Sequence, residues 1–243
     1  MSPAVLITGA SRGIGAAIAE RFAREGWQVG VNFSRSRDEA LELCRRLEKW
    51  TTVLPLQADV SREEQVQSMM EEAQKALGFV DVLINNAGVA HTGLLQDMTV
   101  GQWDRLMGIN LTGCFLCSRA VLPEMIRQHR GAILNISSMW GQTGASCEVA
   151  YSASKAGVIG FTRALAQEVG PSGIRVNCIA PGVIDTQMNG EHSPETMAAL
   201  AEETPLSRIG TPQEVAQAAW FLCSPQASFI TGQVLGVNGG FVV

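Results

Sequence analysis

The strongest constraint on the fold of this chain is the alternation of short apolar runs with longer amphipathic stretches along its whole length. The apolar runs have the length of buried strands, and the stretches between them carry helical periodicity. The expected strands are residues 4–8, 28–33, 52–57, 80–86, 131–137, 174–180 and 233–238. The expected helices are residues 13–26, 37–49, 62–77, 103–129, 151–169 and 211–223. Because parallel strands need long crossovers, this alternation predicts an α/β fold, a single doubly wound Rossmann-type domain over residues 1–243 with a parallel seven-stranded sheet and helices on both faces.

Composition narrows the classes of partner. Hydrophobic residues make up 46% of the 243 residues and charged residues 17%, which is typical of a globular domain. The net charge of -5 gives no general attraction to nucleic acid or to an anionic membrane, and no uninterrupted apolar run reaches the roughly 18 residues of a spanning helix. We therefore expect a cytoplasmic protein with neither partner.

Cysteine and histidine are dispersed along the chain. Cys114 and Cys117 form one C-x-x-C within an apolar helical stretch, without a second pair or a histidine at ligand spacing. This favours core packing over redox chemistry or zinc, and we expect no metal site.

The segment TGASRGIG, residues 8–15, follows the first strand directly and opens the first helix. Gly9 allows a tight turn, Gly13 lets the backbone approach a pyrophosphate, and Gly15 permits close packing of helix on strand. The amino end of the helix adds free N–H groups and a positive dipole. The segment therefore predicts a dinucleotide site, and no G-K-[ST] follows that would indicate a nucleoside-triphosphate loop.

The end of the second strand indicates which dinucleotide binds. An NAD site usually has an acid there for the ribose 2′-OH, but this chain has Phe33, with Arg35 shortly after it and Arg12 in the glycine loop. Guanidinium groups bind a 2′-phosphate, which a carboxylate repels, so we expect NADP(H). In the alternative, Arg35 and Arg37 are only solvated charges before a helix. Asp59, after the third strand, is placed to accept from the adenine amino group or to cap a helix.

The only tyrosine of the chain, Tyr151, stands four residues before Lys155 in a predicted helix. Residues four apart share one helix face, so both side chains can reach one ligand atom. An ammonium group beside a phenol favours the phenolate and suits it to acid–base work. Ser137 and Ser138 end the fifth strand near the start of this helix, where a hydroxyl can hold a carbonyl oxygen. Taken alone, the pair could equally be two polar residues at an exposed helix start.

Six motifs occur together and in order. They are TGxxxGxG at 8–15, NNAG at 85–88, IN at 109–110, SS at 137–138, YSASK at 151–155 and IAPG at 179–182. In combination they resemble the short-chain dehydrogenase/reductase family, and the resemblance covers essentially the whole chain. It implies a catalytic tetrad of Asn110, Ser138, Tyr151 and Lys155.

The resemblance also implies a role for each of these residues. Tyr151 would protonate the substrate oxygen as hydride arrives from the nicotinamide, and Lys155 would bind the nicotinamide ribose. Ser138 would orient the carbonyl, and Asn110 would support a water relay. The implied cofactor contacts are Gly9, Ser11, Arg12, Gly13, Ile14, Gly15, Arg35, Asp59, Val60, Asn86, Ala87, Gly88, Tyr151, Lys155, Pro181, Gly182, Ile184 and Thr186. The C-terminal segment is expected to pack between the subunits of a homotetramer.

Within this family the chain looks closest to bacterial 3-oxoacyl-[acyl-carrier-protein] reductases, which it resembles in the segments VNCIAPG and SRIGTPQEVA. Acyl carrier protein is then the expected partner. Those enzymes often carry docking arginines before the glycines that match Gly131 and Gly173, where this chain has His129 and Ser172.

The segment SMWGQTGASCE resembles a second group, the reductases of some Firmicutes that reduce a 5-aminopentanone group on a lysine of elongation factor P. Glu148 would pair with the amine of such a substrate, and Trp140 would stack over it. Alternatively, Glu148 faces solvent and Trp140 packs the loop. A third hypothesis is a non-catalytic dinucleotide-sensing protein.

Residues 181–210 form the longest irregular stretch and follow the sixth strand, at the edge where open α/β sheets bind ligands. We expect a mobile substrate lid at residues 184–208.

Overall fold

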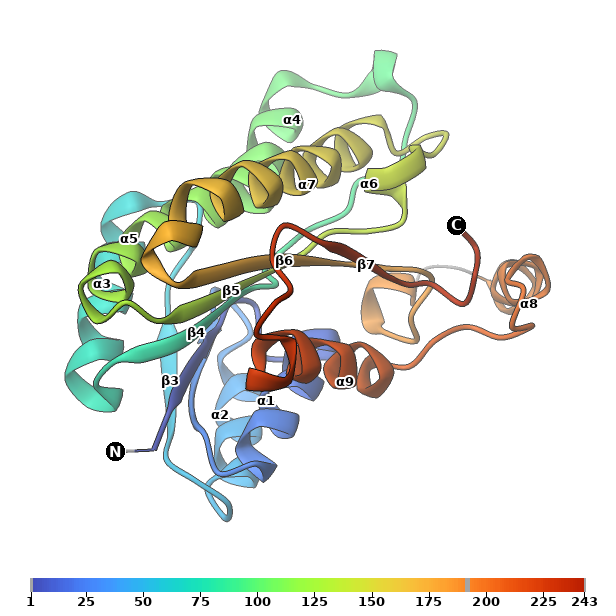
Figure 1. The fold of residues 1–243 in the computed structure, drawn as a ribbon. Helices are drawn as coiled ribbons and strands as arrows, with labels where there is room; N and C mark the ends of the chain where they lie inside the picture. The colour runs from blue at the N-terminus through green and yellow to red at the C-terminus, as the bar shows by residue number, and fades with distance from the viewer. Residues whose placement is uncertain (1, 191–192, 243) are drawn as a thin grey trace.

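A computed structural model of the chain describes residues 2–190 and 193–242, and it confirms the predicted Rossmann-type α/β fold (Figure 1). Seven parallel strands form one sheet in the order β3-β2-β1-β4-β5-β6-β7. The strands are β1 Ala4–Ile7, β2 Gln28–Phe33, β3 Val53–Gln57, β4 Val80–Asn85, β5 Gly131–Ile136, β6 Ile174–Pro181 and β7 Val234–Val237. Each lies within one or two residues of its predicted bounds.

Helices cover both faces of this sheet, as predicted. The α-helices are α1 Gly13–Arg24, α2 Arg37–Leu47, α3 Glu63–Leu77, α4 Val100–Met107, α5 Gly113–Gln128, α6 Trp140–Thr143, α7 Val149–Val169, α8 Pro194–Glu203 and α9 Pro212–Cys223. Short helical turns lie at η1 Leu95–Asp97, η2 Gly108–Thr112, η3 Gly170–Ser172, η4 Gln187–Asn189 and η5 Pro225–Ala227. In Figure 1, α1, α2 and α9 lie on one face of the sheet, and α3, α5 and α7 lie on the other.

Among the described residues, two large apolar cores and one smaller cluster hold these layers together. One contains Ile18 and Phe22 of α1 against β1, β2 and α9, and the ring of Phe22 makes edge-to-face contacts with Trp27 and Trp220. The other large core contains Met70 of α3 against α5, α7 and the opposite face of the strands. Because both faces are buried, the strands read as continuous apolar runs rather than as alternating ones.

The stretch predicted as one helix over 103–129 is interrupted. It begins three residues earlier, at a capping box in which Thr99 accepts from the backbone of Gln102 and the Gln102 side chain accepts in return. The π-helical turn η2 then separates α4 from α5 and carries Asn110. Residues 100–128 are long and apolar enough to cross a membrane by length and composition, and 44% of the apolar window is buried inside the protein. That composition agrees with packing against α3 and α7.

The strand order reverses between β1 and β4. From β1 the chain runs outward to β2 and β3, and from β4 it runs in the opposite direction to β5, β6 and β7. Loops leaving the carboxyl ends of these two strands part and leave a crevice, which is where open α/β sheets bind ligands. The helix α8 lies beyond this edge of the sheet (Figure 1).

Candidate active site

A cavity of about 1460 Å³ follows the carboxyl ends of the strands. It brings together nearly all the residues that the sequence singles out. The predicted residues that line it are Gly9, Ser11, Arg12, Gly13, Ile14, Arg35, Asp59, Val60, Asn86, Ala87, Gly88, Ser138, Trp140, Glu148, Tyr151, Lys155, Pro181, Gly182, Ile184 and Thr186. Gly15 and Asn110 lie beneath this lining and support it.

The glycine loop is tied to the loop that follows β4. Asn86 donates from its side-chain amide to the carbonyls of Thr8 and Gly9, at 3.0 and 2.9 Å, and the Thr8 hydroxyl accepts from the backbone of Asn86 and Ala87. From the other side, the backbone N–H of Gly9 donates to Asn32 Oδ1 at 3.1 Å. Asn32, a buried amide in the middle of an apolar strand, is a supporting residue that the sequence analysis missed. The feature that could have identified it is a polar side chain at a position of β2 where the strand pattern predicts an apolar one.

Two glycines allow the close approach that this arrangement requires. Gly9 has φ +61°, and a Cβ there would lie 2.8 Å from Cα of Ala87. A Cβ on Gly15 would lie 2.6 Å from Nδ2 of Asn86, so only glycine lets α1 begin so close to the sheet. Gly13 and Ile14, in the first turn of α1, line the cavity, and N–H groups at a helix start can bind the pyrophosphate of a dinucleotide.

Positive charge gathers where the adenosine of a dinucleotide would lie. Arg12 and Arg35 are exposed and line this end of the cavity, whereas Arg37 begins α2 and does not. Burial raises the pKa of the Asp59 carboxyl. Hydrogen bonds from the hydroxyl and backbone N–H of Ser61, with the charges of Arg62 and Arg35, outweigh it, so the pKa of Asp59 lies below its ordinary value. Asp59 is thus an ionised acceptor.

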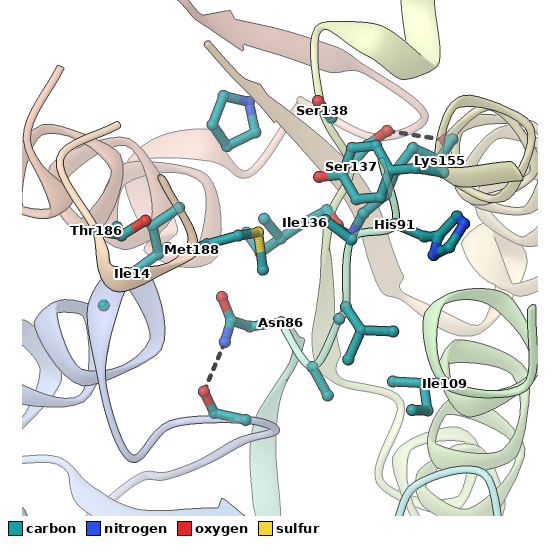
Figure 2. A pocket seen from close by; sticks show the side chains of 18 of the residues that line it. Ile14, Asn86, His91, Ile109, Ile136, Ser137, Ser138, Lys155, Thr186 and Met188 are labelled. Carbon is teal, nitrogen blue, oxygen red and sulfur yellow. Dashed lines mark hydrogen bonds between the residues drawn. The ribbon is translucent and has the colours of Figure 1, made fainter. Parts of the chain in front are cut away.

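Tyr151 and Lys155 lie in the first two turns of α7 and meet at the middle of the cavity. Lys155 is 4% exposed, and its ammonium group lies 5.7 Å from the centroid of the Tyr151 ring. It donates to the carbonyl of Ile136 at 2.8 Å, which fixes it at the end of β5 (Figure 2). The helical spacing therefore places both groups on one face, as predicted.

The two serines after β5 have different roles. Ser137 donates its hydroxyl to the backbone carbonyl of Lys155 at 2.8 Å, which ties β5 to α7 (Figure 2). Ser138 Oγ accepts from the backbone N–H of Trp140 at 3.2 Å, a bond that does not use the hydrogen of the Ser138 hydroxyl. Ser138 also lines the cavity, beside Tyr151 and Lys155.

Asn110 is fully buried in the π-helical turn. Its Oδ1 accepts from the backbone N–H of Val89 at 2.8 Å, and its Nδ2 donates to the carbonyl of Val89 at 2.9 Å and to the Ser154 hydroxyl at 3.0 Å. Both amide hydrogens are thus engaged within the protein. The side chain holds the loop after β4 in place, and a π-helical turn at such a position is a frequent feature of functional sites.

The substrate end of the cavity is walled by segments distant in sequence. Trp140 on α6 and Glu148 at the start of α7 both line it, and the indole of Trp140 packs edge-to-face on Phe241 with centroids 5.5 Å apart. The sequence analysis did not single out His91 and Ile109, which also line the cavity, whereas Met188, Thr196 and Leu200 line it from the predicted lid segment 184–208. Figure 2 shows His91 and Met188 on opposite sides of the cavity.

Cysteine contributes packing in the part of the chain that the structure describes. Cys114 and Cys117 are buried and free, and burial raises the pKa of Cys114 to about 11, as core packing predicts. Over residues 2–190 and 193–242, no three His, Cys, Asp or Glu side chains group as a metal site would require. His192 falls outside the described residues.

Comparison with known proteins agrees with this geometry. A family model described as "Enoyl-(Acyl carrier protein) reductase" matches residues 9–242. The chain is 41% identical over 241 residues to 3-oxoacyl-[acyl-carrier-protein] reductase FabG of Staphylococcus epidermidis, covering 99% of both chains. It is 39% identical over 243 residues to the uncharacterized oxidoreductase YmfI of Bacillus subtilis, again covering 99% of both.

A solved structure extends the likeness to three dimensions. The crystal structure of a 3-oxoacyl-[acyl-carrier protein] reductase from Brucella melitensis superimposes with a TM-score of 0.93 at 38% identity, over 99% of this chain and 92% of that one. The chain therefore belongs to the short-chain dehydrogenase/reductase family, whose members are oxidoreductases that act on ketone or hydroxyl groups with a nicotinamide dinucleotide.

Proposed function

We propose that the protein is an NADPH-dependent ketone reductase of the 3-oxoacyl-[acyl-carrier-protein] reductase type. The observation that carries the proposal is the meeting of Tyr151, Lys155 and Ser138 in one cavity whose far end is lined by Arg12 and Arg35. Relatives from Staphylococcus epidermidis and Brucella melitensis bear the name of this activity.

In the proposed mechanism, bound NADPH supplies the hydride. Ser138 donates a hydrogen bond to the substrate carbonyl, and Tyr151 transfers its phenolic proton to the same oxygen as the carbonyl carbon is reduced. Lys155, held by Ile136, presents its positive charge to the phenolate that remains. Asn110 keeps the loop at Val89 against the cavity, so that substrate and cofactor meet in one orientation.

Two features support this substrate class. Ile109, Met188 and Leu200 give the substrate end an apolar lining suited to an acyl chain, and the cavity volume of about 1460 Å³ leaves room for one beside a dinucleotide. We infer acyl carrier protein as the physiological partner from the names of the relatives.

Initial rates of NADPH and NADH oxidation with acetoacetyl-CoA test the proposal. We expect turnover that is selective for NADPH in the wild type and lost in Tyr151→Phe. Undiminished turnover by Tyr151→Phe would remove the assignment of Tyr151 as the proton donor.

A second substrate is favoured by a specific observation, which is that the Glu148 carboxylate and the Trp140 indole both line the substrate end. This pair suits an aminated ketone such as the 5-aminopentanone group on elongation factor P. Glu148→Gln separates the two substrates. If the aminated ketone is the substrate, the variant loses activity on it while its activity on acetoacetyl-CoA remains. Equal losses on both would contradict amine recognition.

We further propose that residues 184–208 act as a substrate lid, since Met188, Thr196 and Leu200 line the cavity from this segment. Positions 191 and 192 of the lid fall outside the described residues.

We also propose a homotetramer. The edge strand β7 exposes Leu235, and Phe229 nearby in the chain is fully exposed, which is apolar surface that a neighbouring subunit would cover. Light scattering after gel filtration measures this state. A cytoplasmic location is part of the same proposal.

A further inference from the structure

We infer that Ser154 is a positioning residue for the reduction and couples the Asn110 amide to the backbone of Tyr151. The inference rests on the proposed function for its kinetic consequence, but its structural content is independent of the substrate. Ser154 lies in α7 between the two catalytic side chains, and it is fully buried.

The Ser154 hydroxyl uses both of its hydrogen-bonding capacities in defined directions. It donates its single hydrogen to the carbonyl of Tyr151 at 2.7 Å and accepts from Nδ2 of Asn110 at 3.0 Å. A serine inside a helix commonly donates to a carbonyl of its own helix, as Ser154 does to Tyr151, but it does not commonly accept from a side chain of another element. The second joins α7 to the π-helical turn, from a residue 44 positions away in the chain.

The Asn110 amide passes this constraint on to the loop after β4. Two hydrogen bonds join the Asn110 side chain to the backbone of Val89. The preceding residue, Gly88, lies close to both side chains, since a Cβ on it would be 3.3 Å from Nζ of Lys155 and 3.4 Å from Oδ1 of Asn110. A small rotation of the amide therefore moves a loop that touches both the catalytic ammonium and the cavity.

Removal of the Ser154 hydroxyl leaves one amide hydrogen of Asn110 without an acceptor in a fully buried place. A buried donor without a partner is costly, so the amide turns or admits water, and its bonds to Val89 weaken. The Tyr151 carbonyl loses one of its donors in the same step. The expected result is a loss of alignment rather than a loss of binding.

The test compares Ser154→Ala with Ser118→Ala. Ser118 is equally buried and likewise accepts from an asparagine Nδ2, that of Asn85 at 3.1 Å, but the Asn85 amide also donates to Asn135 rather than to the loop at Val89. With NADPH and acetoacetyl-CoA, we expect kcat of Ser154→Ala to fall roughly tenfold while KM and the Kd of NADPH change by less than about threefold. Ser118→Ala should keep the wild-type kcat.

Hydrogen–deuterium exchange gives a readout that needs no turnover. In Ser154→Ala the amide of Val89 should exchange faster, whereas those of Asn86 and Ala87, held by the Thr8 hydroxyl, should not change. Unchanged exchange at Val89, or an equal kcat loss in Ser118→Ala, would overturn the inference. If the wild type is active and Ser154→Ala keeps the wild-type kcat, the inference is overturned as well. A wild type inactive on acetoacetyl-CoA would count against the proposed function alone, and exchange at Val89 would still decide the coupling.

Discussion

Arg35 and Arg37 stand two residues apart after β2, and only the first lines the cavity. Arg35→Ala should therefore weaken NADPH binding, while Arg37→Ala, which removes the same charge from the same segment, should leave it nearly unchanged. Neither substitution should alter NADH binding by more than about twofold, because NADH has no 2′-phosphate to lose contact with.

The magnitude follows from the exposure of Arg35. A hydrogen bond to a charged group contributes roughly 1.5–3 kcal/mol, and solvent reduces this for an exposed side chain. Since Arg35 is exposed, the lower end applies, and roughly a tenfold rise in the Kd of NADPH is expected. Arg12→Ala should act similarly. The double variant should lose less than the product of the two effects, because both guanidinium groups would share one ligand.

Fluorescence titration of NADPH and NADH at low and high ionic strength measures these constants. Wild-type affinity for NADPH should fall with salt, and that of Arg35→Ala should fall less, because part of the screened attraction is already gone. Equal effects of Arg35→Ala and Arg37→Ala on NADPH, or equal effects of Arg35→Ala on both cofactors, would refute the assignment of Arg35 to the 2′-phosphate.

Three further outcomes are expected. Tyr151→Phe should lower kcat by at least roughly 100-fold, with the Kd of NADPH unchanged in a titration. Arg175→Met should lower the free energy of unfolding in urea by about 2–4 kcal/mol. The partly buried guanidinium donates to the carbonyls of Leu222 and Cys223 at the end of α9, and to those of Ser224 and Ile230 beyond it. A loss within error of zero would contradict this capping role. Hydrogen bonds from the Arg208 side chain and the Thr211 backbone lower the pKa of Glu214 from 4.5 to about 2, so Glu214→Gln should be less stable than the wild type at pH 7. That difference should disappear as the pH falls from 4.5 to about 2, where the folded protein also binds the proton, and a difference that persists at pH 2 would assign it to another cause.

The sequence predicted those parts of the site that follow from strand and helix periodicity. Loops after parallel strands converge on one edge, so Gly9 and Asp59 could be placed together from the sequence, and the family resemblance added Asn86. Residues four apart share a helix face, so Tyr151 and Lys155 could be paired.

The rest depends on contacts between segments that no local pattern describes. Arg35 lines the cavity and Arg37, at the start of α2, does not, and the charge pattern after β2 does not by itself distinguish a bound arginine from a solvated one. The π-helical turn is invisible in a pattern with helical period throughout, so Asn110 was assigned by resemblance and its partner Ser154 was not recognised. The stacking of Trp140 on Phe241 joins residues about a hundred positions apart, and it depends on the path of the C-terminal segment.

The hydrogen bonds that hold the cavity loops explain why similarity to known proteins predicts the chemistry of this protein more firmly than its substrate. On the cofactor side, the loops are held by side chains that bond to the backbone of another segment, as Asn32 does to Gly9 and Ser137 does to Lys155. A substitution there leaves a buried polar group without its partner, which destabilises the loop that it holds. Trp140, Glu148 and residues of α8 line the end of the cavity that we propose for the substrate. We expect Glu148→Gln to change the preference between substrates more than the rate of the shared reaction, and rates on acetoacetyl-CoA and on an aminated ketone measure this difference.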